Sequence, residues 1–253
     1  MSRARRRIGR PPWPAAAGVL LVAALVAGLY GGAIGLIRHQ EAEAPGITFA
    51  PPAAAAAEPP EAMSPLPVFA RSDGVALRIL SSDVVAVAFH EASYRDATEL
   101  RPMGVCDVCR NRWKFDPPPP VDPELSYLVT DTRGRSTPAT SAADVVLPPG
   151  AAVMAPVTGT VTGVEHYRLY RKYPDVRLEL RPDSAPDRRV VLLHLANVRL
   201  APGMRVEAMT TRLGIVRGFR FESQVDRYVR GRNPHVHIEV KDPARTRRPP
   251  KKR

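Results

Sequence analysis

The chain has 253 residues and a formal net charge of +12, with 37 lysines and arginines against 25 aspartates and glutamates. This length allows one or two domains, and the basic excess raises nucleic acid, anionic lipid and an acidic polymer as candidate partners. Aromatic residues make up only 6% of the chain and form no stacking series, which argues against binding to single-stranded nucleic acid.

An uncharged apolar stretch, residues 15–37, lies near the N-terminus. At about 1.5 Å per residue, a helix of this length crosses the roughly 30 Å hydrocarbon core of a bilayer. The basic segment 1–14 precedes it, and the positive-inside rule places that segment in the cytoplasm. The sequence therefore predicts a single-pass protein of the cell membrane whose bulk is extracytoplasmic and does not meet nucleic acid. A cleaved signal peptide ending near Ala42-Glu43-Ala44 is the competing interpretation.

The segment 38–66 is rich in Ala, Pro and Glu, a composition that buries too little apolar surface to offset the loss of chain entropy. It is predicted to be a semi-extended linker. The basic tail, residues 243–253, is predicted to be disordered for the same reason. Two interpretations of this tail and of Arg133-Gly134-Arg135 stay open, namely a solvated surface or a contact with anionic wall polymers or lipid headgroups.

Residues 67–135 are expected to form a small β-rich subdomain. Within it, Gly74 to Leu80 and Val84 to Phe89 have β-branched runs bounded by polar turns, which is typical of strands. The proline-rich stretch from Asp116 to Pro123 must be an extended loop, because consecutive prolines lack the N–H groups that a sheet needs. This loop is expected to separate the subdomain from the rest of the chain.

Cys106 and Cys109 are the chain's two cysteines and form a C-x-x-C pair. In an oxidising compartment, the simplest expectation is a short-range disulfide that clips a turn. A redox motif lacks the surrounding βαβ pattern, and a zinc site needs two further ligands. Both remain as alternatives.

Residues 136–242 show a series of strand patterns separated by Gly and Pro. Alternation with a period of two runs through Val157 to Val164, Val176 to Arg181 and His235 to Val240, and a continuous apolar run extends from Val190 to Leu195. Many short strands without a long amphipathic helix predict a mainly β fold, an antiparallel β-sandwich or rolled sheet, after the N-terminal transmembrane helix.

His235 and His237 must project from the same face of their strand, because side chains alternate along a strand. Val236, Ile238 and Val240 then project from the opposite face and anchor the strand in a core. The face with two imidazoles is free to line a cleft, although two histidines at this spacing also occur on ordinary wet surfaces.

Several elements follow one another in order between residues 137 and 240. They are Thr140-Ser-Ala-Ala-Asp144, the turn from Pro149 to Val161, Leu192-Leu-His194-Leu195, Pro202-Gly203 and His235-Val-His237. This order resembles that of the LytM and lysostaphin-like zinc endopeptidases, which cut peptidoglycan peptides and have a duplicated hybrid motif fold. The resemblance implies a LytM-type peptidase domain that acts on a peptidoglycan peptide or another cell-wall component.

The resemblance also assigns roles to individual residues. Asp144 and His237 match zinc ligands, whereas His194 and His235 match residues that hold the attacking water or stabilise the tetrahedral intermediate. The first ligand position, a histidine in active members, is occupied by Thr140, and a neutral hydroxyl is not a usual zinc ligand. The sequence therefore suggests a degenerate member, a non-catalytic peptidoglycan-binding or regulatory module that binds zinc weakly or not at all.

Two alternatives remain open. If His90 or His166 replaces the missing ligand, the protein is an active zinc endopeptidase that hydrolyses peptide cross-links of peptidoglycan. The other alternative is an extracytoplasmic scaffold that does not contact peptidoglycan. A protein partner, the oligomeric state and the type of cross-link do not follow from the sequence.

Overall fold

The computed structural model describes residues 66–246. The predicted transmembrane helix (15–37), nearly all of the linker (38–66) and most of the tail (243–253) lie outside this range. Within it, no helix is long and apolar enough to cross a membrane. Residues Pro243–Thr246, at the start of the expected disordered tail, form a short helix, α1.

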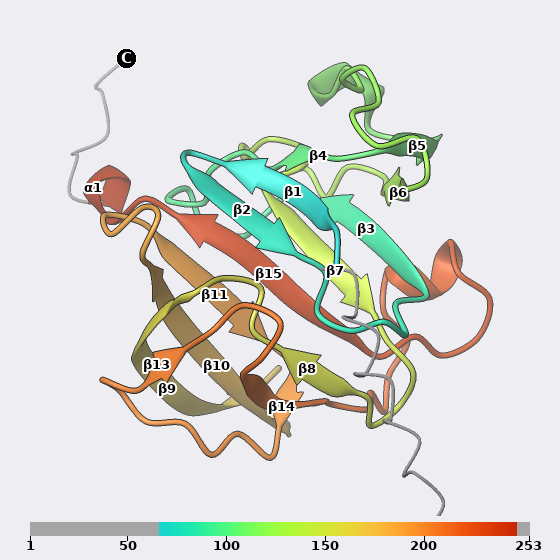
Figure 1. The fold of residues 1–253 in the computed structure, drawn as a ribbon. Helices are drawn as coiled ribbons and strands as arrows, with labels where there is room; N and C mark the ends of the chain where they lie inside the picture. Colours follow the sequence, from blue (N-terminus) through green and yellow to red (C-terminus); the bar gives the residue numbers. More distant parts are fainter. Residues whose placement is uncertain (1–65, 247–253) are drawn as a thin grey trace, which may run out of the picture. The chain divides into compact units, whose positions relative to one another are not determined.

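The described part of the chain is built mainly from short strands (Figure 1). These are β1 (Val68–Ser72), β2 (Val75–Arg78), β3 (Ala86–His90), β4 (Arg101–Pro102), β5 (Val105–Cys109), β6 (Ser126–Val129), β7 (Ala142–Val146), β8 (Ala152–Met154), β9 (Gly159–Leu169), β10 (Tyr173–Pro182), β11 (Arg189–Leu193), β12 (Leu195–Ala196), β13 (Arg205–Val206), β14 (Arg212–Val216) and β15 (His235–Lys241). Short 3-10 helices, η1 (Arg112–Lys114) and η2 (Val225–Arg227), interrupt them.

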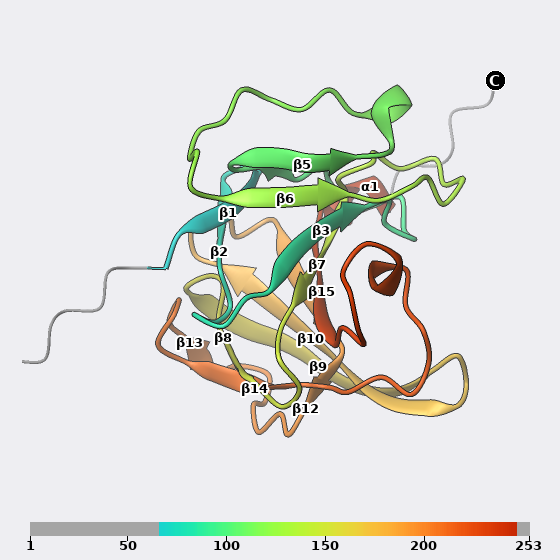
Figure 2. The same ribbon diagram turned by 90° about the vertical axis from the view of Figure 1, so that its right-hand side faces the viewer.

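A nine-stranded sheet runs through the described residues in the order β13-β9-β10-β11-β15-β7-β3-β6-β5. Its pairs from β13 to β3 are antiparallel, which confirms the predicted mainly β, antiparallel class. At the other end, β6 pairs in parallel with both β3 and β5, as Figure 2 shows. These parallel pairs could not be predicted, because the alternation of side chains along a strand does not depend on the direction of the neighbouring strand.

The boundary expected near residue 135 lies within this sheet, since β3, β5 and β6 precede it in the chain and β7 follows it. Strand β7 pairs with β3 on one side and with β15 on the other. Residues from the start, middle and end of the described range therefore lie side by side in three neighbouring strands.

The core lies on one face of the large sheet, where two three-stranded sheets, β2-β1-β4 and β12-β14-β8, contribute to the same cluster of buried residues. Val145 of β7 and Ile238 of β15 point into this core, together with Leu77 of β2 and Leu213 of β14. On β15, Val236, Ile238 and Val240 are all fully buried, as the alternation predicted. The opposite face carries Asp144 on β7 and His235, His237 and Glu239 on β15, beside small apolar clusters that include Val146 and Ala142.

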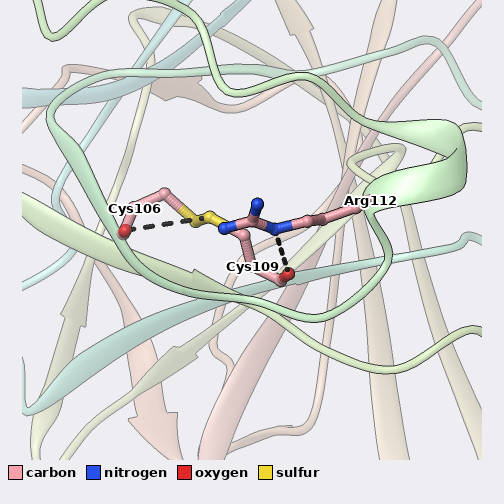
Figure 3. Close-up of a disulfide and its surroundings, with 3 residues drawn as sticks. All are labelled: Cys106, Cys109 and Arg112. Atoms are coloured by element: carbon pink, nitrogen blue, oxygen red, sulfur yellow. Dashed lines mark hydrogen bonds between the residues drawn. A yellow bond between two sulfur atoms is a disulfide. The ribbon is translucent and has the colours of Figure 1, made fainter.

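Cys106 and Cys109 form a disulfide, as expected (Figure 3). They do not lie at a turn but within β5, at an irregularity in its pairing with β6. Arg112 Nε donates a hydrogen bond of 3.4 Å to the Cys109 carbonyl. The disulfide stiffens the edge strand of the sheet and takes no part in the cluster of histidines described below.

Candidate active site

Three neighbouring strands place an imidazole, a carboxylate and a second imidazole on one face of the sheet. Asp144 in β7 lies directly opposite His237 in β15 and opposite Ala88 in β3. His90 is two residues beyond Ala88, so its side chain points to the same face as Asp144. Strand alternation and register therefore gather the three side chains, although they are widely separated in sequence.

The three side chains are close enough to share one cation. Asp144 Oδ1 is 3.0 Å from His90 Nε2 and 2.9 Å from His237 Nδ1. One ligand atom from each residue lies within 4.8 Å of those of the other two. Two histidines and one carboxylate, with space for a further ligand, is a usual donor set for a catalytic zinc ion.

In His90 and His237, the ring nitrogen that faces away from Asp144 donates a hydrogen bond to the protein. His90 Nδ1 donates to the Glu91 carbonyl over 2.9 Å, and His237 Nε2 donates to Glu239 Oε1 over 3.0 Å. Hydrogen bonds of this kind fix the tautomer and orientation of metal-binding histidines. They leave His90 Nε2 and His237 Nδ1 directed at Asp144.

The buried His90 Nε2 atom is an observation that favours a cation. It makes no hydrogen bond to the described residues, and its nearest polar neighbour is a carboxylate oxygen of Asp144. Because Nδ1 carries the proton of the neutral ring, Nε2 presents a lone pair to an acceptor. A shared cation would remove this repulsion, so the residues present fit a zinc ion.

The charges of the cluster agree with this interpretation. Burial lowers the pKa of His90, more than the attraction of Asp144 raises it, so this ring is neutral. Burial alone would raise the pKa of Asp144, but the neighbouring histidines hold it well below its usual value. Burial likewise opposes protonation of His237, but hydrogen bonds to Asp144 and Glu239 raise its pKa to about 9. Metal binding would displace this proton.

His194 and His235 flank the cluster. The ring centroids of His194 and His235 are 5.6 Å apart, and those of His194 and His237 are 6.2 Å apart. His235 Nδ1 donates to the Asn233 carbonyl over 2.9 Å, and its Nε2 lies 3.6 Å from Asp144 Oδ2. All four predicted site residues are therefore brought together.

A buried aspartate holds His194. Asp175 Oδ2 accepts hydrogen bonds from His194 Nδ1 over 2.6 Å and from the Tyr167 hydroxyl over 2.8 Å, and its Oδ1 accepts one from the Val176 N–H over 2.8 Å. His194 itself has a φ of 70°, an uncommon conformation for a residue other than glycine. Such strain is retained where surrounding contacts enforce it, and it often marks a functional position.

The histidines open into a cleft of about 280 Å³. Its lining combines the site residues with aromatic and charged side chains from three loops, namely Arg133, Arg135, Asp144, Leu169, Tyr170, His194, Phe219, Phe221, Glu222, Ser223, Gln224, His235 and His237. Phe219 and Phe221 stack with ring centroids 5.0 Å apart, and Phe219 also contacts the ring of His194. The aromatic rings form a wall beside the histidines.

The other two candidates do not belong to this cluster. Thr140 is fully buried, its hydroxyl has no partner among the described residues, and it lines a separate cavity of about 630 Å³. His166 is exposed on β9 and lines a third cavity. The third side chain that lies beside Asp144 and His237 is therefore His90, which the sequence suggested only as a substitute.

Several site residues were not predicted. Asp175 had no signal in the sequence, because it meets His194 only through the pairing of β10 with β11. Arg133 was noticed only as part of a basic run, with no sign that it lies beside the histidines. Glu239 did have a signal, since it follows His237 at i+2 and must therefore share its face of β15. The alternating pattern His-x-His-x-Glu contained this hydrogen-bond partner.

Glu91, next to His90, holds the loop that borders the cleft. Its Oε1 accepts hydrogen bonds from Asn111 Nδ2 over 3.1 Å and from the Thr132 hydroxyl over 2.8 Å, and it forms an ion pair with Lys114. Its Oε2 accepts hydrogen bonds from the backbone N–H groups of Arg133 (3.0 Å) and Arg135 (2.8 Å). Burial opposes ionisation, yet these donors lower the pKa of Glu91 to about 2.

Replacing Glu91 with Gln is expected to lower the free energy of unfolding by about 3 kcal/mol, because it leaves Lys114 without its carboxylate in a buried network. Urea denaturation of the full-length protein measures this change. Glu124→Gln is the matched control, since Glu124 is exposed and should change stability by less than about 0.5 kcal/mol. Equal unfolding midpoints for the two variants would contradict the prediction.

The fold and the site define a mainly β domain with a His, Asp, His cluster in a cleft. Neither a scan of protein-family models nor a search of curated proteins gives a match to this sequence. Solved structures with local similarity include lysostaphin (17% identity, TM-score 0.29, 39% of this chain and 35% of that chain).

Two further structures are similar in the same way. One is a zinc-containing peptidase from Vibrio cholerae (21% identity, TM-score 0.29, 43% of this chain and 28% of that chain). The other is a putative M23 peptidase from Pseudomonas aeruginosa (21% identity, TM-score 0.29, 51% of this chain and 50% of that chain). Each alignment spans half or less of the neighbour's chain.

Proposed function

We propose that this protein is a zinc-dependent endopeptidase of the LytM type that cleaves peptide cross-links of peptidoglycan. The observation that carries the proposal is the convergence of His90, Asp144 and His237, whose ligand atoms lie within 4.8 Å of one another. The sequence alone favoured an inactive module because Thr140 stands at a ligand position. With His90 beside Asp144, the set of donors is complete, and the active alternative becomes the better explanation.

A zinc ion bound by His90, Asp144 and His237 would polarise a carbonyl group and lower the pKa of water toward neutrality. The histidines around it have the geometry to move protons. Asp175 holds the Nδ1–H of His194, so the free Nε2 of that ring is a base. His235 is oriented in the same manner by the Asn233 carbonyl, and its Nε2 faces the cluster.

The cluster is buried on the side of His90 and Asp144 and opens to the cleft on the side of His194 and Phe219. His90, Asp144 and His235 are each no more than 5% exposed, which strengthens the electrostatic interactions among them. The ring of Phe219 lies beside both His194 and His235, with centroid distances of 5.0 and 4.6 Å. A peptide lying along this aromatic wall would present its backbone to the histidines.

The proposal includes a location. Residues 15–37 are long and apolar enough to form a membrane anchor, and the basic residues before them favour an extracytoplasmic position for the domain. The linker 38–66 would then allow the folded domain to reach peptidoglycan. Added protease checks this placement. We expect residues 66–246 to be protected in intact cells and to be digested once the layers outside the cell membrane are made permeable.

One assay tests the function. Full-length protein is incubated with purified peptidoglycan, with added zinc or with a chelator, and both soluble fragments and protein in the pellet are measured. We expect soluble fragments with newly formed amino groups in the samples with zinc and none in the samples with the chelator. Pelleting without release would instead indicate a binding module, and neither release nor pelleting would indicate a scaffold.

A further inference from the structure

The loop Arg133-Gly134-Arg135 carries two arginines into the wall of the cleft. Gly134 has a φ of 68°, which permits the tight bend between them. Both flanking N–H groups donate to the buried carboxylate of Glu91, and Arg135 Nη1 donates to the Glu91 carbonyl over 2.7 Å. The loop is therefore fixed to the residue that follows the metal donor His90.

The guanidinium of Arg133 has unused hydrogen-bonding capacity. Its Nε donates to Gln224 Oε1, whereas its two terminal nitrogens make no hydrogen bond within the described part of the chain. The nearest carboxylate oxygen, Asp144 Oδ2, is 3.8 Å from Nη2, which is too far for a hydrogen bond. The side chain is only 24% exposed, so water compensates for the missing partners incompletely.

The acidic groups of the cleft offset the charge of this arginine only in part, through the long ion pair with Asp144. Asp144 already contacts His90 and His237 and would serve as a metal ligand in the proposed function. Glu222, the other carboxylate in the lining, is exposed, and no ion pair joins it to Arg133 among the described residues. Arg135 adds a second positive charge to the same wall.

We propose that Arg133 recognises a carboxylate of the substrate next to the peptide bond that is cleaved. The proposal rests on the proposed function, because it names the substrate group of the same cleft. A guanidinium fork matches a carboxylate with two parallel hydrogen bonds. Since Nη2 lies beside Asp144, the recognised group belongs to a residue at the reacting bond. It is either a terminal α-carboxylate or the carboxylate of an acidic side chain.

The test compares cross-linked dimeric muropeptides in three forms: unmodified, amidated at terminal carboxylates, and amidated at side-chain carboxylates. For the zinc-loaded full-length protein, we expect kcat/KM to fall about tenfold or more on one of the amidated forms. The form that is cleaved slowly identifies the source of the carboxylate. Arg133→Gln should cleave all three forms at the same low rate.

Arg199→Gln is the matched control, because Arg199 is exposed on the loop between β12 and β13, and it should keep the wild-type preference. Arg133→Met, which has no charge, serves if the Gln variant does not fold. The proposal is overturned if the wild-type protein cleaves all three forms equally, or if a folded Arg133 variant keeps the preference.

A second readout does not depend on catalysis. Full-length protein treated with a chelator is sedimented with insoluble peptidoglycan, either native or amidated with ammonia and a carbodiimide. We expect amidation to weaken binding of the wild-type protein and of Arg199→Gln, and to leave the already weak binding of Arg133→Gln unchanged. If zinc-loaded protein cleaves no form, the proposed function fails, whereas equal loss of binding for all three proteins on amidation overturns the carboxylate subsite.

Discussion

Replacing His90 with Ala is expected to abolish stoichiometric zinc binding and to reduce peptide hydrolysis to background. Removing merely a hydrogen-bond partner of a metal-binding histidine lowers metal affinity by about 10- to 100-fold, so loss of a donor should exceed this. Only Asp144 and His237 would remain of the three donors. Elemental analysis of the purified full-length protein and titration with a zinc-competing dye measure the effect.

Thr140→Val is the decisive control for His90. If Thr140 were a ligand, its loss would lower zinc affinity, but Thr140 lines a different cavity and its buried hydroxyl has no partner among the described residues. Replacing an unsatisfied buried hydroxyl with a methyl group is neutral or stabilising. The Val variant should therefore keep zinc and activity. Retention of zinc by His90→Ala, or its loss from Thr140→Val, would show that the assignment of donors is wrong.

Asp175→Asn should lower kcat by about a hundredfold or more while leaving KM within about threefold and zinc content unchanged. The aspartate does not touch the three metal donors, but it fixes the tautomer of His194 through a hydrogen bond of 2.6 Å. General acid or base catalysis contributes about 10²- to 10⁴-fold to a rate, and this contribution requires the correct tautomer. Steady-state kinetics on a defined muropeptide separates kcat from KM.

The pH dependence of kcat distinguishes a positioning role for Asp175 from a structural one. Loss of the carboxylate should move the limb of the profile that reports His194, whereas a general loss of folded protein lowers the whole profile without moving it. Asp187→Asn, at an exposed side chain, is the matched control. A kcat equal to that of the wild-type protein would contradict the role of Asp175.

The positions of the strands could be predicted from the sequence better than the pairing between strands. Alternation placed Val236, Ile238 and Val240 in the core and left His235 and His237 for the cleft, because this pattern depends only on the local geometry of a strand. It could not show that β3 pairs with β7, since long-range pairing depends on packing across the sheet. For that reason His90 stood only as a substitute for the ligand missing at Thr140.

The residues that orient the site show the same limit. Glu239 shares a strand with His237, so its position was implicit in the alternation, whereas Asp175 meets His194 only because β10 and β11 pair in a particular register. Arg133 lines the cleft because its backbone N–H donates to the buried carboxylate of Glu91, a contact between two segments that are distant in sequence. Local sequence patterns therefore indicated which strand carries the candidate site, whereas tertiary contacts determine which other residues contribute to it.

The placement of β7 between β3 and β15 affects how the protein should be divided for experiments. A fragment cut to residues 136–242, the part that resembles a peptidase in sequence, would retain Asp144 and His237 but would lack His90 and the strand that carries it. Such a fragment would also expose the edge of β7, with unpaired backbone groups and a tendency to aggregate. An inactive fragment would then reflect the cut, because the cluster of His90, Asp144 and His237 includes a residue well upstream of the motifs that resemble a peptidase.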